Sequence, residues 1–115
     1  MRYEELLFNG QNAFPTMQLA VGTEVGDAVT ITGQAEVGRG VDGQILVGKV
    51  LTKEADGMGA VAIWGAGFTD FATVGVLTAG VQPLVVDGTG KVKVGASGRQ
   101  VLVVVARDGE AAIQL

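Results

Sequence analysis

The sequence predicts an all-β protein: a small antiparallel β-barrel or β-sandwich with an extended N-terminal arm. Three observations support this prediction. Valine-rich runs dominate the chain, and β-branched residues favour pleated sheet over helix. The 19 glycines among 115 residues follow no collagen period, so they indicate many tight turns between short strands. Gly and Asp-Gly turns separate the runs, which is the pattern of consecutive β-hairpins.

Residues 1–20 differ from the rest and are predicted to form an arm or a lead-in strand. They hold the only Tyr and two of the four Phe, and they show no sustained period of 3.6 or 2. Pro15 breaks any helix that the preceding residues could begin. Large apolar residues are unusual in a disordered terminus. We therefore expect the domain or a partner to cover Tyr3, Leu6, Leu7, Phe8 and Phe14.

Residues 21–115 are predicted to form a single β domain, since the chain has the length of one domain. Predicted strands span residues 28–32, 34–37, 44–51, 59–65, 74–79, 83–87, 91–95, 99–106 and 110–115. The clearest hairpin is VVDGTGKVKV, at residues 85–94. The runs 44–51 and 99–106 are almost continuously apolar, so both of their faces should be covered. That requires either the central strands of a closed barrel or a subunit interface.

A weak internal repeat relates two halves of the domain, at about residues 25–65 and 80–115. When the halves are overlaid, residues 44–47 meet residues 100–103, and Ile63 meets Ile113. Two such units could wrap one small barrel or sandwich. Any chain rich in Val and Gly aligns with itself, so a real repeat and a chance similarity are both open at this stage.

A literal G-x-G-x-x-G occurs at Gly38, Gly40 and Gly43. A dinucleotide-binding turn needs a strand before it and a helix after it, because the helix N-terminus meets the pyrophosphate. The residues that follow, QILVGKVL, are β-branched and have no helical period. We therefore interpret the stretch as a glycine-rich connection between strands.

Composition argues against several classes of function. The net charge of −4 and the scattered Lys and Arg disfavour nucleic acid and anionic membrane surfaces as partners. The sequence has no cysteine, so no disulfide framework is expected. Neither a signal peptide nor a membrane span is visible, so we expect synthesis in the cytosol without export.

Catalytic and metal-binding residues are also scarce. There is no histidine for acid–base chemistry, and the only serine, Ser97, lies in a predicted turn. We expect no enzymatic activity, no metal and no cofactor. A glycosidase-type carboxylate pair is disfavoured, because such enzymes usually line the cleft with aromatic residues and Trp64 is the only tryptophan. Four aspartates directly precede glycine, as turns require without any ion: Asp42, Asp56, Asp87 and Asp108.

Trp64, Phe68 and Phe71 form the aromatic segment of the domain. Three interpretations are open. The side chains could pack in the core, they could anchor a protomer interface, where Trp and Phe concentrate, or they could form a platform that stacks on sugar.

The order of segments resembles the small capsid decoration, or cement, proteins of tailed bacteriophages. The matching segments are VGDAV at 25–29, QILVGKVLTKEADGMGAVAIWG at 44–65, AGVQPLVVD at 79–87 and GKV at 90–92, followed by a long Val strand and a short final strand. The resemblance covers roughly residues 21–115 and is a pattern of segments without an invariant motif. The arm is longer than in the family, and LVVD stands where the family has aromatics.

The resemblance implies a compact, β-tulip-like domain that forms a homotrimer on the virion capsid surface. There it would stabilise the head by clamping neighbouring major capsid protein subunits, without catalysis. We expect the arm to contact the capsid or a neighbouring trimer, and the aromatic segment to lie between protomers. Two alternatives are another phage structural oligomer, such as a tail or spike component, and a ligand- or carbohydrate-binding β-module.

Overall fold

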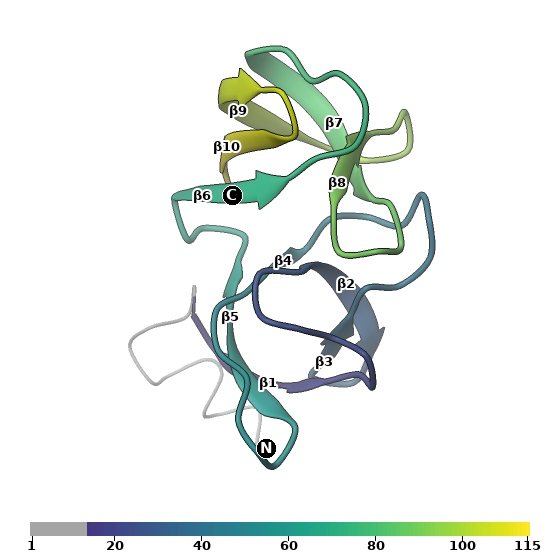
Figure 1. Ribbon diagram of the computed structural model, residues 1–115, viewed down its shortest axis with the longest axis vertical. Coiled ribbons are helices and arrows are strands. Elements are labelled where there is room, and N and C mark those ends of the chain that lie inside the picture. The colour runs from purple at the N-terminus through teal and green to yellow at the C-terminus, as the bar shows by residue number, and fades with distance from the viewer. Residues whose placement is uncertain (1–13) are drawn as a thin grey trace.

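The computed structural model describes residues 14–115, which form two lobes stacked along the longest axis of the molecule (Figure 1). Strands β1 to β5 make the first lobe and strands β6 to β10 make the second. Within the described range there are ten strands and no helix, which confirms the all-β prediction. The first lobe is a closed barrel, so barrel rather than sandwich is the correct description of that half.

The first barrel has the strand order β1-β3-β2-β4-β5. Its strands are β1 (Thr16–Leu19), β2 (Ala28–Gly33), β3 (Glu36–Gly38), β4 (Gly48–Val50) and β5 (Met58–Ile63). The pairs are antiparallel except for β1 and β3, which run parallel. Side chains alternate along each strand, so one set fills the interior: Met17, Leu19, Val29, Val37, Val50 and Val61.

The second lobe is a five-stranded sheet in the order β6-β10-β9-β7-β8. Its strands are β6 (Phe68–Ala72), β7 (Gly80–Val86), β8 (Val92–Val94), β9 (Arg99–Arg107) and β10 (Glu110–Gln114). A parallel bridge between Thr73 and Val92 joins the end of β6 to β8. The two edge strands therefore approach each other, and the sheet curves around its own apolar interior.

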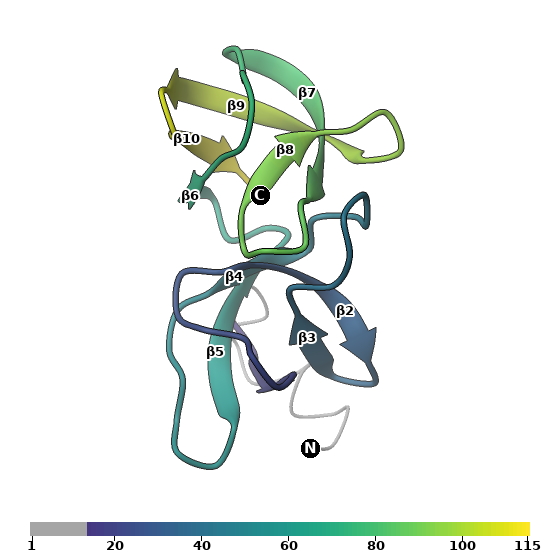
Figure 2. The same ribbon diagram turned by 45° about the vertical axis from the view of Figure 1, so that its right-hand side comes forward.

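The two lobes share one topology. Each begins with a lead strand, continues through a hairpin, and ends with an antiparallel pair, and both hairpins are visible in Figure 2. Leu19 pairs in parallel with Val37 in the first lobe, as Thr73 does with Val92 in the second. β4 with β5 corresponds to β9 with β10.

A shared apolar cluster joins the lobes. Ala28, Leu46 and Ala62 of the first half belong to the same buried cluster as the interior of the second lobe. Backbone hydrogen bonds cross the junction as well: Ala28 N donates to Gly90 O at 2.8 Å, and Val86 N donates to Gln44 O at 2.9 Å. The core of the second lobe therefore extends into the first half, while the first barrel keeps an interior cluster of its own.

Most predicted strands are confirmed, with three informative exceptions. The hairpin at 85–94 is present as β7 and β8. Of the run 44–51 only Gly48–Val50 is a strand. The predicted strand at 74–79 is a loop, and the observed strand β6 was not predicted. Gly75 has a φ of +77°, a left-handed conformation that interrupts a strand.

The glycine-rich stretch is β3 followed by the β3–β4 loop, and strand β4 rather than a helix comes next, as predicted. Gly40 and Gly43 have φ values of +65° and +97°, which suit glycine in a turn. Gly48 in β4 has a different reason to be glycine. A Cβ at this position would collide with the carbonyl oxygen of Ala62 on the neighbouring strand.

Candidate functional site

The outer face of the second sheet carries exposed apolar residues on several neighbouring strands. We define the outer face as the solvent-facing side of β6, β10, β9 and β7, which carries Phe68, Asp70, Val81, Leu102, Val105, Arg107, Glu110 and Ala112. Phe68 is 72% exposed and Leu102 is 41% exposed. Cross-strand pairing aligns Val81 with Leu102 and Leu102 with Gln114.

A β-bulge widens this face at its centre. Ala112 pairs with Val105 and Ile113 pairs with Val103, so Val104 has no residue opposite it on β10. A bulge re-aims side chains and increases local twist. Val104 and Val105 are consequently both partly exposed on consecutive positions of β9. The prediction that both faces of 99–106 are covered is therefore wrong for a single copy of the chain.

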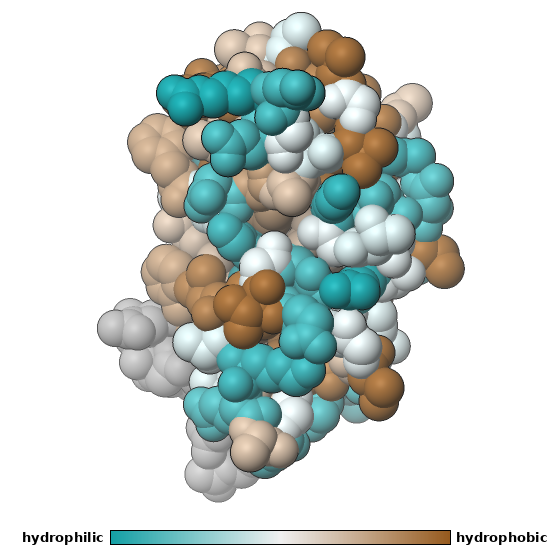
Figure 3. Space-filling model, in the orientation of Figure 1, coloured by the Kyte–Doolittle hydropathy of each residue, from teal (hydrophilic) through white to brown (hydrophobic). Residues whose placement is uncertain are grey.

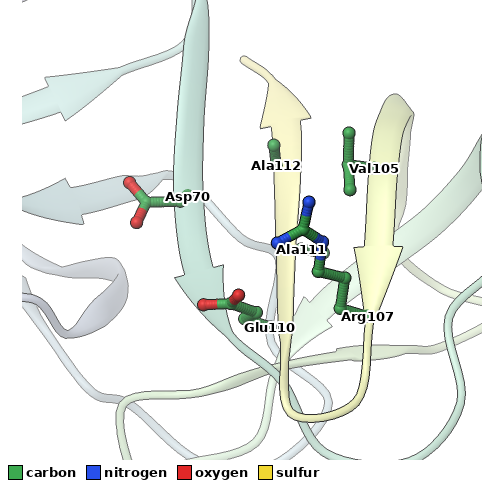
Figure 4. Close-up of a pocket in the computed structure, with 6 residues that line it drawn as sticks. All are labelled: Asp70, Val105, Arg107, Glu110, Ala111 and Ala112. Atoms are coloured by element: carbon green, nitrogen blue, oxygen red, sulfur yellow. The ribbon is translucent and has the colours of Figure 1, made fainter.

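A shallow depression of about 250 Å³ lies on the outer face, where the small side chain of Ala112 sits between larger neighbours (Figure 4). Asp70 lines it from β6, Glu110 from β10, and Val105 and Arg107 from β9. The Arg107 side chain extends over the face between β9 and β10 (Figure 4). Charged groups thus surround a small apolar floor.

Two acidic groups and one basic group give this face its electrostatic pattern. Lys49 Nζ donates to the carbonyl oxygen of Asp70 at 2.7 Å and to its Oδ1 at 3.3 Å. The hydrogen bond from Lys49 lowers the pKa of Asp70 below its ordinary value, which keeps the carboxylate charged. Within the described part of the chain, Arg107 and Glu110 are cross-strand neighbours without an ion pair.

Trp64 lies at the junction of the lobes and not on the outer face. Its Nε1 donates to the carbonyl oxygen of Leu46 at 2.9 Å, and the Arg99 guanidinium lies 4.2 Å from the ring centroid. A guanidinium at this distance makes a cation–π contact. Arg99 therefore covers one face of the Trp64 ring, and the side chain as a whole is 43% exposed.

The structure separates the aromatic residues that the sequence grouped together. Phe68 and Phe71 are three positions apart on β6 and therefore point to opposite faces. Phe71 is 2% exposed and packs in the interior, as the core interpretation expected, so it does not belong to any surface. Trp64 and Phe68 remain partly or largely exposed.

The arm residues are placed only at their C-terminal end. Tyr3, Leu6, Leu7 and Phe8 lie outside the described residues, and Phe14 is partly exposed at the start of the described chain. Residues 16–19, which the sequence analysis counted with the arm, form β1 and close the first barrel. Sequence reasoning did not name Val81, Leu102, Val104 or Val105, although the apolar run 99–106 was the signal for three of them.

Exposed apolar residues also occur elsewhere on the molecule, where they are scattered. In the space-filling view they appear as separate brown areas between hydrophilic residues of both lobes (Figure 3). No group of three or more acidic residues able to hold a metal ion occurs in the described range. Nor does that range contain a helix long and apolar enough to cross a bilayer.

Comparison with known proteins adds no identification. No protein-family model matches the chain, and no curated protein matches it.

Proposed function

We propose that this chain is a non-enzymatic decoration protein that binds to the outside of a tailed-bacteriophage head. In this proposal it stabilises the head by clamping neighbouring major capsid protein subunits, and several copies act together as a homotrimer on the capsid surface. The observation that carries the proposal is the exposed apolar outer face on a compact β body. The order of the strand-forming segments, which resembles that of decoration proteins, supports the same function.

The fold suits a protein that holds capsid subunits together, because the molecule is compact and packing and hydrogen bonds join its two lobes. A closed barrel has no free edge strand, and the second lobe shares its apolar cluster with the first. Lys49 from the first lobe binds the backbone carbonyl of Asp70 on edge strand β6. Charged side chains at an exposed edge strand disfavour strand pairing with other molecules. Binding would then use side-chain surfaces in place of this edge.

The energetics of such binding are favourable when several copies act together. A specific contact buries about 800 Å² per partner. At about 25 cal/mol per Å² of apolar area, each contact contributes several kcal/mol before the entropic cost of association. Linked copies then bind as one unit, because the effective concentration of the second and third contacts is high. A modest interface per copy is therefore sufficient for stable decoration.

The arm is proposed to supply a second contact, to the capsid or to a neighbouring trimer. The chain enters the first barrel at Pro15, whose carbonyl accepts a hydrogen bond from Val61 N at 3.0 Å. Residues 16–18 are occupied in β1, so the arm contact must come from the residues before Pro15. An extended apolar segment can add to a neighbouring sheet by β-augmentation. The residues proposed to do so are Tyr3, Leu6, Leu7, Phe8 and Phe14.

Co-sedimentation with phage heads tests the proposal. Mature heads of a tailed phage that encodes this chain, stripped of it, are mixed with the purified protein and pelleted. We expect saturable binding to heads and an increase in the temperature at which the heads rupture. Binding to tails but not to heads would favour the tail-component alternative, and binding to neither would refute both.

A further inference from the structure

The four Asp-Gly pairs of the chain share a chemical reactivity that their surroundings in the fold control. The glycine nitrogen can attack Cγ of the preceding aspartate, because glycine has no side chain to obstruct the approach. An N–Cγ bond forms, and one carboxyl oxygen leaves as water with the amide proton and the carboxyl proton. Water then reopens the resulting five-membered succinimide. When it attacks the main-chain carbonyl carbon, the bond from that carbon to nitrogen breaks, and the chain continues through Cγ as isoaspartate with no net change in mass.

Hydrogen bonds restrain the pair at Asp42. Ring closure requires the glycine nitrogen to meet Cγ, so each interaction that holds either group must break first. Gly43 N donates to Val86 O at 3.0 Å. The Asp42 carboxylate pairs with Lys93 Nζ at 2.6 Å. Both reacting groups of this pair are therefore held.

The pairs at Asp56 and Asp87 are restrained as well. Gly57 N donates to the carbonyl oxygen three residues earlier at 3.1 Å, and the Asp56 carboxylate accepts a hydrogen bond at 3.0 Å from the backbone N–H two residues later. The Asp87 carboxylate accepts three hydrogen bonds. Two come from the N–H and the hydroxyl of Thr89, at 2.8 and 2.7 Å, and one comes from Lys91 N at 3.1 Å.

Asp108 has neither restraint within the described part of the chain. No backbone hydrogen bond there is donated by Gly109 N, and no hydrogen bond or ion pair engages the Asp108 carboxylate. Both residues are exposed, and no atom beyond the adjoining residues lies within 4 Å of where a Cβ of Gly109 would project. They form the turn between the paired residues Arg107 and Glu110, which appears below these two side chains in Figure 4.

The turn at Asp108 also holds one edge of the second sheet in place. Gly109 O accepts a hydrogen bond from Thr73 N at 3.0 Å, and the nearly buried Thr73 forms the parallel bridge to Val92 on β8. Isoaspartate adds Cβ to the path of the main chain, so the connection between Arg107 and Gly109 becomes one atom longer. That extra atom displaces the carbonyl that binds Thr73. The reaction therefore loosens the contact that brings the end of β6 to β8.

We propose that Asp108 is a site of spontaneous isoaspartate formation, while hydrogen bonds protect the other three Asp-Gly turns. The reaction needs only water, and it does not depend on binding to phage heads. A hydrogen bond of ordinary strength that must break first lowers the rate about fivefold. Since each of the other pairs has at least two such restraints, Asp108 should form isoaspartate at least about fivefold faster than any of them.

Site-resolved mass spectrometry of the aged protein tests this assignment. The folded protein is kept at mildly acidic pH and physiological temperature. It is then digested with an endoproteinase that cleaves before aspartate but not before isoaspartate, and electron-transfer fragmentation identifies the isomer at each pair. The same protein in concentrated urea is the control, because the four pairs have the same reacting atoms. Without the fold, their rates should agree within about threefold.

Two variants of Asp108 test the chemistry and its effect on the sheet. Asp108→Asn loses ammonia in place of water, which is the easier step, so it should convert faster than the wild type. Asp108→Glu keeps the charge but needs a six-membered ring, which forms far more slowly, so it should resist ageing. Once most of the wild type has converted, its urea midpoint should fall by about 0.5 M, whereas that of aged Asp108→Glu should not change. Asn9-Gly10 lies outside the described residues and is scored separately, because its deamidation changes the mass.

Three results would overturn the proposal. One is isoaspartate that is no more abundant at Asp108 than at another Asp-Gly pair of the folded protein. Another is the same order of rates in urea, because the neighbouring sequence alone would then explain the preference. A slower conversion of Asp108→Asn than of the wild type would show that the turn prevents ring closure. An unchanged urea midpoint of the converted wild type would refute the loosening of the sheet.

Discussion

Leu46 provides the sharpest test of how the two lobes depend on each other. It lies in the β3–β4 connection of the first half, is fully buried, and packs in the cluster that fills the second lobe. Truncation to Ala removes buried methyl groups and leaves a cavity, which costs 2–5 kcal/mol in well-packed cores, and we expect about 3 kcal/mol here. A domain of this size has an unfolding free energy of about 5–15 kcal/mol. The substitution therefore removes a substantial fraction of the total.

Urea denaturation followed by two probes measures this effect. Trp64 is the only tryptophan and hydrogen-bonds Leu46 O, so its fluorescence reports on the junction, while far-ultraviolet circular dichroism reports on both sheets. With an m-value of about 2 kcal/mol/M, Leu46→Ala should lower the midpoint by about 1.5 M. Both probes should shift together, because the core of the second lobe extends into the first and couples the two lobes into one unfolding unit. Two separate transitions, or a shift in the fluorescence alone, would refute the coupling of the two lobes.

Three further predictions concern local structure and the arm. Gly48→Ala should destabilise the protein by at least about 2 kcal/mol, because the new Cβ collides with Ala62 O; an unchanged urea midpoint would contradict this. Burial disfavours the charged form of Asp87, but hydrogen bonds from Thr89 and Lys91 outweigh it and lower its pKa. This carboxylate therefore contributes stability above its unfolded pKa of about 3.9, and that stability is lost as the pH falls through the lower folded pKa. Asp87→Ala should lower the free energy of unfolding by about 1 kcal/mol at pH 7 and by much less at about pH 2. An equal loss at both pH values would show that hydrogen bonds to the ionised carboxylate are not the cause. Deleting residues 1–14 should abolish binding to heads and leave the circular dichroism spectrum unchanged, since Pro15 and β1 are retained; full head occupancy by the truncated chain would rule out the arm contact.

The sequence was sufficient for the fold class and for the strands bounded by strong turn signals. The Asp87-Gly88 turn between alternating residues determined the β7–β8 hairpin. Strand β6 was missed because Phe68–Ala72 is short and follows two left-handed glycines, Gly65 and Gly67. The loop at 74–79 is predicted as a strand because most of its residues are apolar. Its sequence does not show that Gly75 adopts a left-handed conformation, which ends the extended backbone.

The candidate surface could be predicted only in part, because its definition depends on strand register. Phe68 and Phe71 are indistinguishable by residue type, and only the pairing of β6 with β10 shows which of them points outward. The run 99–106 is apolar on both faces, so its sequence cannot tell which residues are exposed. The bulge at Val104, which depends on tertiary pairing, then places two consecutive valines in partly exposed positions.

Binding to phage heads is the central claim, and the most direct measurement is the number of copies that co-sediment with stripped heads at saturation. The account predicts a saturable occupancy in multiples of three at fixed sites on the outside of the head. Electron microscopy of the same particles should show the added mass on the outer surface. An absence of bound protein at saturating concentration, with the chain folded and in solution, would contradict the account.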